Sequence, residues 1–432
     1  MIETCKVCSN DFELTNEDLA WYKKFNEEPQ GLCFECSQKR RLCFRNERSL
    51  YKRKCDATGE EIISIYSPDK PYKVCKSDYW YSDKWDPLEY GGDFDFDRPF
   101  FEQFKELQLE VPRLALSNFR GINSDYCNMT MGNKNCYLIF GGDFNEDSMY
   151  GTLCMENRDV ADCDYSNYCE VCYEISDCIR CYNCNFATDC KECTDCNYIA
   201  DCIGCRECIF CTNLINQSYY IENKKLTKEK YPARKKEILK DREKAYEKFL
   251  EIREKRIVKF AHQINCENCT GDYLKNCKNC INCFDAAECE DMKDIIYASP
   301  KCKDCYNSGL LGHASVMGYN MQSMLSAFNC KHSFFIIYAS DIDYSDHAIS
   351  SSHLFGCVSL RHKKYCILNK QYSREDYKQM RGRIIEQMKK TGEYGQFLPP
   401  DLSCFGYNES TAHIYYPLTK EQALKEGFNW KD

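Results

Sequence analysis

The sequence predicts a mainly β protein with helices: an N-terminal zinc-finger module, then a duplicated, narrow, right-handed β-helix of 12-residue coils, each lobe followed by a helix. Three observations predict this fold class. Two C-x2-C pairs lie near the N-terminus, cysteines recur at every third position in two later stretches, and two separate stretches align without a gap. The predicted segments are a zinc-finger module with a basic segment and β-hairpin (1–90), a linker and capping helix (91–122), β-helix lobe 1 (123–218), a long charged helix (219–262), β-helix lobe 2 (263–368), and a helix with a C-terminal docking tail (369–432).

The composition argues against membrane-spanning, secreted and disulfide-bonded classes of protein. The chain has 432 residues, 35 cysteines, only 7 histidines and a formal charge of -9. An apolar run of roughly 18 residues would indicate a membrane span, and neither such a run nor a signal-peptide pattern occurs. We therefore expect a cytoplasmic protein with no membrane contact, in a compartment where thiols stay reduced. The odd number of cysteines also argues against complete disulfide pairing.

The first C-x2-C pairs predict a zinc site. Their four cysteines are separated by a spacer long enough for a helix and a turn, and they are Cys5, Cys8, Cys33 and Cys36. Two such pairs supply the tetrahedral thiolate set of a structural zinc site, and the alternative is a simple cluster of thiols. Four thiolates leave no open position, so the expected role of the zinc is structural and not catalytic.

A weaker second metal site is expected just downstream. Two further turns each keep one cysteine, and the candidate ligands are Cys55, Cys75 and Asp78. The alternative is a plain β-hairpin over residues 60–75, with its turn at Ser-Pro-Asp-Lys.

A basic segment, residues 39–54, lies between the second C-x2-C pair and Cys55. It carries eight Lys or Arg residues against one Glu: Lys39, Arg40, Arg41, Arg45, Arg48, Lys52, Arg53 and Lys54. Such a segment with interleaved aromatic residues is typical of a phosphate-binding surface. The alternatives are a solvated helix face and a surface that docks onto acidic parts of the same chain, such as residues 93–97.

Cysteines on a lattice of threes predict the β-helix. In the first stretch the lattice cysteines are Cys178, Cys181, Cys184, Cys190, Cys193, Cys196, Cys202, Cys205, Cys208 and Cys211. A period of three fits neither a helix nor an ordinary strand, whereas a 12-residue repeat fits a narrow solenoid. In the second stretch the small residues run from Cys277 to Ala298, and the pattern resumes at Cys302 after a one-residue slip.

The lattice thiols have three candidate roles. They can fill the solenoid core as small apolar side chains, bind metal in ordered sites, or form disulfides across coils. Core packing is favoured because the duplicated stretch places Ala348, Ser351 and Leu354 where the first has cysteines. A separate column of Asp177, Asp189 and Asp201 is either a cation-binding ladder or a set of local turn caps.

The lattice resembles the 12-residue β-helix of insect antifreeze proteins, which also point Cys, Ser and Ala inward at every third position. The flat Thr-x-Thr face of those proteins is absent here, so the resemblance implies the fold and not ice binding. Stretches such as RRLCFRNERSLYKRKCDATG and SDKWDPLEYGGDFDF, together with the C-x2-C pairs, resemble a family of cysteine-rich proteins of small-genome, uncultivated bacteria. That resemblance implies the architecture and no activity.

An internal alignment predicts the duplication. Residues 211–231 align with residues 357–377 at an offset of 146, matching for example Ile221 with Ile367 and Asn223 with Asn369. Thr227 and Ser373 both lie where a helix N-cap belongs. Each lobe is therefore expected to end in a short strand followed by a helix, the first of these being one long charged helix.

No catalytic residue is predicted. The leading interpretation is a non-enzymatic zinc-binding scaffold that contacts nucleic acid, with ribosomal RNA as one candidate, through the basic segment and a protein partner through the β-helix. The first alternative is a thiol-based metal-handling or redox protein. The second is an enzyme with a groove between the lobes, for which the residues to inspect are His313, His332, His347 and His353.

Overall fold

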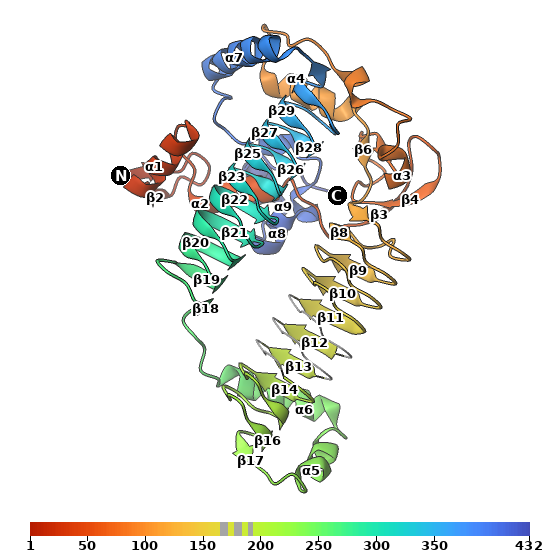
Figure 1. Ribbon diagram of the computed structural model, residues 1–432, viewed down its shortest axis with the longest axis vertical. Helices are drawn as coiled ribbons and strands as arrows, with labels where there is room; N and C mark the ends of the chain where they lie inside the picture. Colours follow the sequence, from red (N-terminus) through yellow and green to blue (C-terminus); the bar gives the residue numbers. More distant parts are fainter. Residues whose placement is uncertain (165–171, 177–183, 189–192) are drawn as a thin grey trace. The chain divides into compact units, whose positions relative to one another are not determined.

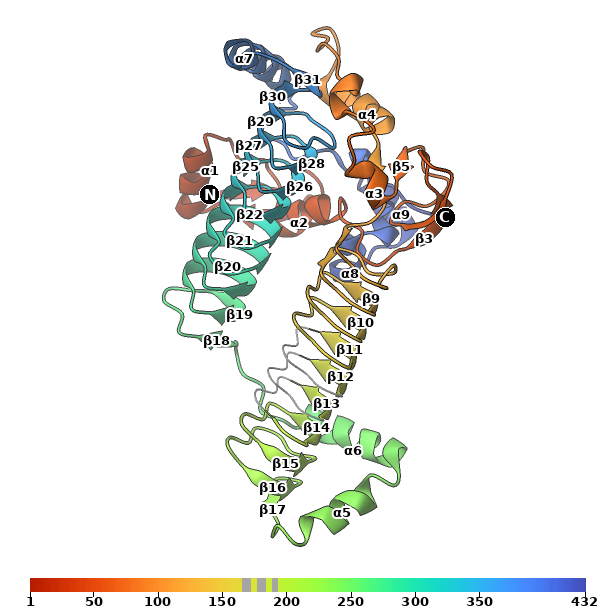
Figure 2. The same cartoon turned by 45° about the vertical axis from the view of Figure 1, so that its right-hand side comes forward.

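The computed structural model describes residues 1–164, 172–176, 184–188 and 193–432 and shows a mainly β chain with a β-solenoid and helices (Figure 1). The chain divides into two compact units, Met1–Ala115 with Ala261–Asp432, and Leu116–Phe260. Each unit contains a stack of parallel strands (Figure 2), so the predicted cysteine-rich β-solenoid is confirmed. Within the described helices, none is long and apolar enough to cross a membrane. Several predicted lattice and ladder positions lie outside the described residues: Cys178, Cys181, Cys190, Asp177 and Asp189.

The N-terminal part of the first unit is a mixture of short hairpins and helices. Its elements are β1 (Ile2–Thr4), β2 (Asp11–Glu13), α1 (Asn16–Phe25), α2 (Phe34–Leu42), β3 (Tyr51–Lys54), β4 (Glu61–Ser64), β5 (Val74–Cys75), α3 (Ser77–Trp80), the 3₁₀ helix η1 (Pro87–Tyr90), α4 (Phe100–Glu110) and β6 (Arg113–Leu114). α1 begins at a capping box in which Thr15 and Asp18 exchange hydrogen bonds. It ends where Asn26 adopts a left-handed conformation.

The expected hairpin over residues 60–75 does not form. β4 pairs antiparallel with β3, whereas β5 pairs in parallel with β6, which lies nearly forty residues further along the chain. The hairpin turn therefore forms one strand pair earlier, across residues 55–60. The sequence pattern identified strand residues correctly but not their partners, because strand pairing depends on contacts distant in sequence.

The solenoid of the first unit is a long parallel stack closed by one antiparallel strand. Its strands are β18 (Gln263–Ile264), β19 (Gly271–Lys275), β20 (Lys278–Ala287), β21 (Glu290–Ala298), β22 (Lys303–Leu311), β23 (Val316–Tyr319), β24 (Gln322–Leu325), β25 (Phe328–Lys331), β26 (Phe334–Ile337), β27 (Ser340–Asp343), β28 (Asp346–Ile349), β29 (Ser352–Phe355), β30 (Lys364–Ile367) and β31 (Lys370–Gln371).

The strand register confirms the predicted columns. Cys280 lies opposite Met292, and Met292 lies opposite Cys305. The first step is twelve residues and the second thirteen, which is the predicted one-residue slip. Further along the same column come Cys330, Ile342 and Leu354 in successive coils.

Left-handed residues form the corners of each coil. In β20 and β21 the residue before every inward side chain has a positive φ, for example Asn279 (φ 51°), Asn282 (φ 54°) and Asp294 (φ 57°). Asn and Asp tolerate this conformation better than other non-glycine residues do. The frequent Asn and Asp before each lattice cysteine therefore supply the corners, while the cysteines supply the core.

The lattice thiols in the described solenoids are buried and bonded to the backbone. The Sγ of Cys280 donates to the carbonyl of Lys278 at 3.4 Å and contacts that of Cys289, in the next coil, at 3.5 Å. Ser308, in a neighbouring column, makes the same short-range bond to the carbonyl of Tyr306. Cysteine and serine thus occupy equivalent core positions as small hydrogen-bonding side chains.

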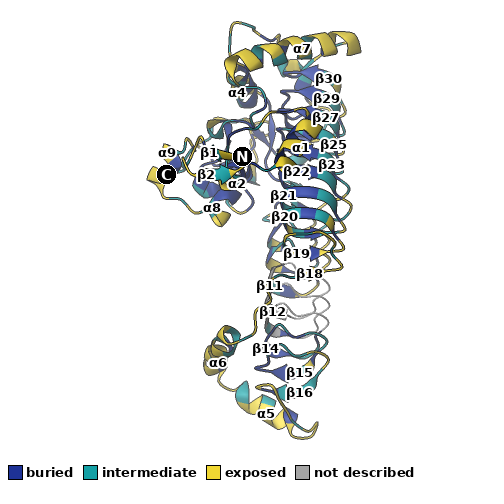
Figure 3. Cartoon of the chain, turned by 90° about the vertical axis from the view of Figure 1, so that its left-hand side faces the viewer, coloured by how far each residue is buried: buried dark blue, intermediate teal, exposed yellow. Residues whose placement is uncertain are grey.

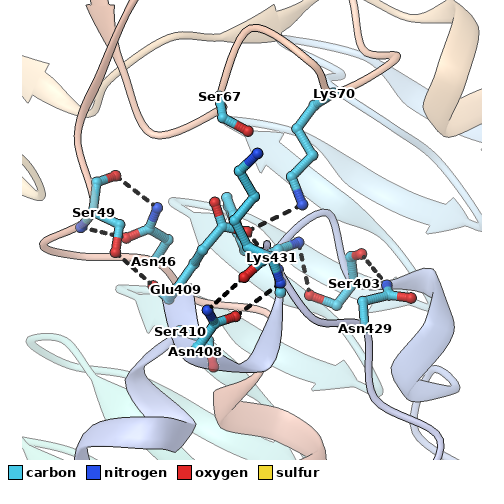
Figure 4. Close-up of polar contacts among 12 residues, drawn as sticks. Asn46, Ser49, Ser67, Lys70, Ser403, Asn408, Glu409, Ser410, Asn429 and Lys431 are labelled. Carbon is cyan, nitrogen blue, oxygen red and sulfur yellow. Dashed lines mark hydrogen bonds and ion pairs between the residues drawn. The ribbon is translucent and has the colours of Figure 1, made fainter. Parts of the chain in front are cut away.

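The C-terminal segment packs back onto the N-terminal part of the first unit. Its elements are α7 (Arg374–Thr391), η2 (Pro400–Leu402), η3 (Tyr407–Glu409), α8 (Thr411–Tyr415) and α9 (Lys420–Lys425). Figure 4 shows the contact: Glu409 pairs with Lys70 at 3.1 Å, and the hydroxyl of Ser49 donates to the carbonyl of Glu409 at 3.4 Å. Phe428 is buried in this segment.

The second unit is a solenoid with two helices. Its elements are β7 (Asn118–Phe119), β8 (Thr130–Met131), β9 (Tyr137–Phe140), β10 (Met149–Thr152), β11 (Val160–Asp164), β12 (Cys172–Ser176), β13 (Asn185–Thr188), β14 (Asn197–Ala200), β15 (Arg206–Ile209), β16 (Ser218–Ile221), β17 (Lys224–Lys225), α5 (Tyr231–Ile238) and α6 (Arg242–Glu254). The expected single long helix is two helices, because Asp241 caps a new helix by accepting from the backbone of Lys244. Asp201 is the member of the predicted aspartate column that lies in the described residues. It has a left-handed backbone (φ 52°), and its carboxylate pairs with Arg256 at 2.8 Å.

Candidate metal centre

Four thiols of the N-terminal segment come together. The sulfur atoms of Cys5, Cys8, Cys33 and Cys36 all lie within 4.8 Å of one another. Cys5 and Cys36 are buried, and the other two are half-buried. Across the described ranges of the chain, no other group of three His, Cys, Asp or Glu side chains is arranged to hold a metal ion. These are the residues that the two C-x2-C pairs predicted.

Two backbone turns aim these thiols at one point. The N–H of Cys5 donates to the carbonyl of Asn10 at 2.9 Å, and the N–H of Ser9 donates to the carbonyl of Cys5 at 3.0 Å. Cys33 is the N-cap of α2, and its own N–H donates to the sulfur of Cys5 at 3.4 Å. The N-terminal end of α2 thus adds partial positive charge beside the sulfur atoms.

The four thiols lie so close together that their pKa values depend on one another. The neighbouring Cys36 thiol lowers the pKa of Cys33 to about 5, and the same contact raises the pKa of Cys36 above its ordinary value. One thiolate therefore forms readily, and its charge opposes the next ionisation. A bound cation removes this opposition, because metal binding stabilises each ligand thiolate.

The donor set suits one tetrahedral ion. Four sulfur ligands are typical of structural zinc, and the same set also holds iron. With four protein ligands, a tetrahedral ion has no position left for a substrate. An ion bound here would therefore cross-link two chain segments, and iron in place of zinc would add electron transfer.

The helices next to the centre, α1 and α2, pack against the solenoid of the same unit. Trp21 stacks on Tyr306 with ring centroids 5.7 Å apart, and Phe25 stacks on Tyr319 at 5.2 Å. On α2, Arg41 donates to Asn320 at 3.0 Å. The four thiols lie on the turns that position both helices.

A second turn repeats the geometry of the first. The N–H of Cys55 donates to the carbonyl of Glu60, and the N–H of Gly59 donates to the carbonyl of Cys55, both at 2.8 Å. These bonds match those around Cys5. The N–H of Lys76 donates to the sulfur of Cys55 at 3.4 Å, and Lys76 is the N-cap of α3. Lys76 is therefore the counterpart of Cys33.

This correspondence locates the ligand positions of the second turn. The counterparts of the other three ligand cysteines, Cys8, Cys33 and Cys36, are Thr58, Lys76 and Tyr79. Only Cys55 retains a sulfur atom. The predicted ligands Cys75 and Asp78 each lie one residue before the positions equivalent to Cys33 and Cys36. Together with Cys55 they do not form a three-ligand group. Burial raises the pKa of Cys75 to about 12, which also opposes metal binding.

The basic segment is mostly occupied by contacts within the protein. Lys39, Arg41, Arg45 and Arg53 are buried. Lys39 pairs with Glu426 at 2.7 Å, and the half-buried Arg40 donates to the carbonyl of Leu398 at 3.1 Å. The remaining three of the eight predicted nucleic-acid-binding residues are exposed: Arg48, Lys52 and Lys54.

The four histidines considered for catalysis lie on separate strands and turns, with His347 on β28 and His353 on β29. His332 is buried against Tyr344 and lies 3.7 Å from Glu27. His353 stacks on Tyr365 and lines a cleft of about 290 Å³. None of His313, His332 and His347 lines that cleft.

Two buried polar contacts were not foreseen from the sequence. Arg113 on β6 pairs with Asp346 on β28, and Glu27 pairs with Lys331 at 2.7 Å. In the sequence, each of these contacts is marked only by one charged residue within a predicted solenoid coil, Asp346 or Lys331. Comparison of the sequence with models of known protein families and with curated proteins gives no match.

Proposed function

We propose that this protein is a non-enzymatic scaffold in which one zinc ion cross-links two turns of the N-terminal segment, whose helices α1 and α2 pack against a β-solenoid. The observation that carries the proposal is the cluster of Cys5, Cys8, Cys33 and Cys36, with all four sulfur atoms within 4.8 Å. Because the cluster uses four protein ligands, zinc bound there acts as a cross-link and not as a Lewis acid.

Burial of the lattice thiols supports a scaffold over a thiol-based metal-handling or redox protein. Cys280, Cys283 and Cys305 are fully buried, and burial raises the pKa of Cys305 beyond its usual range. Buried thiols with raised pKa values are inert toward metals and oxidants. In addition, Met292 and Ile342 interrupt the column that contains Cys280, so that column has no continuous ladder of ligands.

Metal analysis of anaerobically purified, full-length protein tests the proposal. We expect about one zinc per chain, as for a single four-thiolate site. Cys36→Ser should release the zinc, whereas the matched lattice variant Cys280→Ser should retain it. Iron in place of zinc, several metal ions per chain, or zinc retained by Cys36→Ser would each overturn the proposal.

We also propose that the N-terminal basic segment contacts nucleic acid, over a smaller surface than its composition predicted. Arg48, Lys52 and Lys54 are the exposed residues that can take part. The protein partner of the β-helix also remains a proposal. It is supported by the exposed aromatic side chains of Phe328 and Tyr338, which border a shallow cleft of about 440 Å³.

The proposed architecture includes a duplicated solenoid with right-handed coils. The matching end of each solenoid supports the duplication. Asn223 donates to and accepts from the backbone of Thr212, and Asn369 makes the same two bonds to Val358. Both pairs are 146 residues apart, the offset of the internal alignment.

A further inference from the structure

A dense positive surface covers the end of the second unit's solenoid. We call residues 224–240 the basic cap; it comprises β17, the following turn and α5. It carries eight cationic residues, Lys224, Lys225, Lys228, Lys230, Arg234, Lys235, Lys236 and Lys240, against two acidic residues, Glu229 and Glu237. Eight minus two gives a charge of +6 in a chain whose net charge is -9.

The fold of the cap turns its apolar side chains inward and its lysines outward. Tyr231 is buried, and Leu226, Ile238 and Leu239 pack against the same hydrophobic cluster beside the last coils. Seven of the eight cationic residues are exposed, and Lys235 is half-buried. The resulting surface, on β17 and α5, is open to solvent (Figure 3).

Most of these charges have no ion-pair partner in the described part of the chain. Arg234 pairs with Glu237 at 2.6 Å, and Lys235 lies 3.6 Å from Glu207. The other six form no ion pair within the described part of the chain: Lys224, Lys225, Lys228, Lys230, Lys236 and Lys240. The neighbouring α6 differs, since its Lys244 and Lys248 both pair with acidic residues three positions away. Pairing of charges within the helix is therefore a feature of α6 and not of the cap.

The solenoid end does not require these lysines for folding. At the offset of 146, the end of the other solenoid has the same strand pair and the same aromatic contact, Tyr365 on Tyr377 in place of Tyr219 on Tyr231. There, however, the counterparts of Lys230, Lys236 and Lys240 are Asp376, Gly382 and Glu386. Three of the eight cationic positions keep a cation there, as Lys370, Arg374 and Arg381, and the other five do not. The same fold is thus built with much less positive charge.

We propose that the basic cap binds the phosphate backbone of nucleic acid without sequence preference. Closely spaced lysines neutralise phosphates and release their counterions, which gives affinity independent of base sequence. The aromatic ring of Tyr231 is buried, so it is not available for stacking on bases. A membrane surface fits less well, because an interfacial helix presents an exposed apolar face and the apolar residues of the cap pack inward.

Fluorescence anisotropy with full-length protein tests this inference. The probes are a labelled 20-nucleotide single-stranded RNA and a 20-base-pair DNA duplex, titrated at several salt concentrations. The variant combines Lys224→Gln, Lys225→Gln, Lys228→Gln, Lys230→Gln and Lys236→Gln. We expect at least a ten-fold loss of affinity at low salt. For RNA, the log–log salt slope should fall by roughly 3, since each phosphate contact contributes about 0.7.

A matched control removes the same charge elsewhere. Five lysines of the other unit are exposed and unpaired within the described residues: Lys23, Lys84, Lys364, Lys390 and Lys425. Their combined change to Gln should leave affinity within two-fold of wild type. Equal losses in both variants would reduce the effect to net charge and overturn the proposal. Absence of binding, or preference for an acidic peptide or an anionic vesicle, would also overturn it. Zinc content is read separately, so failure here leaves the metal proposal standing.

Discussion

The guanidinium of Arg113 lies 2.7 Å from the carboxylate of Asp346, and both side chains are buried. Arg113 belongs to β6 in the N-terminal part of the unit, and Asp346 to β28 of the solenoid. The rings of Tyr66 and Tyr72 border the guanidinium. The pair therefore links two segments more than two hundred residues apart in sequence.

Removing one member of this pair should be strongly destabilising. Asp346→Asn leaves Arg113 buried without a counter-charge, and we expect a loss of about 3 to 5 kcal/mol. The measurement is urea unfolding followed by tryptophan fluorescence, because all four tryptophans lie in this unit. The control is Glu110→Gln at the exposed pair with Lys73, which should cost less than about 1 kcal/mol. Similar losses in both variants would contradict the assignment.

The same pair predicts an acid-sensitive stability. Burial alone would raise the pKa of Asp346, but the charges and hydrogen bonds of Arg113 and His347 together outweigh it and lower that pKa below its ordinary value. A carboxyl with a lowered folded-state pKa stabilises the fold above its unfolded pKa of about 3.9, and the contribution is lost as pH falls through the folded value. The gap between wild type and Asp346→Asn should therefore be widest near neutral pH and shrink below about pH 4. A constant gap would exclude the charge as its cause.

The second turn predicts that a metal site can be rebuilt. Combining Thr58→Cys, Lys76→Cys and Tyr79→Cys with the existing Cys55 should raise zinc content by about one per chain, because four thiolates then occupy the positions of the first site. The control follows the spacing in the sequence and combines Thr58→Cys with Asp78→Cys. That variant also has two C-x2-C pairs, but its second pair is one residue out of register. Extra zinc in the control alone would refute the structural correspondence.

This one-residue difference shows what the sequence can and cannot predict. The spacing of Cys5, Cys8, Cys33 and Cys36 identified four thiols that the fold brings into one cluster able to hold a metal ion, because the residue types themselves carry the chemistry. In the second turn only Cys55 remained, and Cys75 lay close enough to imitate a ligand. The true register depends on which backbone N–H reaches the sulfur, and Lys76 has no sequence signature for that role.

Periodicity was the most reliable guide to the solenoid. Inward positions at every third residue predicted the columns and the slip before Cys302, since a narrow core admits only small side chains. Charge was a poor guide. Lys39 and Arg41 belong to a basic segment by composition, but both are buried in contacts with parts of the chain that are distant in sequence. The sequence does not indicate which cations find acceptors inside the fold.

Serine should replace cysteine in the lattice with little cost. Cys283, Ile295 and Ser308 occupy one column, and the side chains of Cys283 and Ser308 both donate to the carbonyl two residues earlier. We expect Cys283→Ser to change the free energy of unfolding by less than about 1.5 kcal/mol, since one hydrogen-bonding group replaces another. Cys283→Asp is the contrasting variant, because it buries an unpaired carboxyl and should cost considerably more. Zinc content should remain unchanged in Cys283→Ser.

Thiol reactivity should follow position along the solenoid of the first unit. Cys266 and Cys269 in the first coil are half-buried, whereas Cys277 and Cys280 in the next coil are buried. Alkylation of native, zinc-loaded protein, read by peptide mass spectrometry, should therefore modify Cys266 well before Cys277 or Cys280. Cys269 should react more slowly than Cys266, because burial raises the pKa of the Cys269 thiol and only the thiolate reacts. Unfolding in denaturant should equalise the rates. Uniform labelling of native protein would show that the core thiols are accessible, and the packing role assigned to them would then fail.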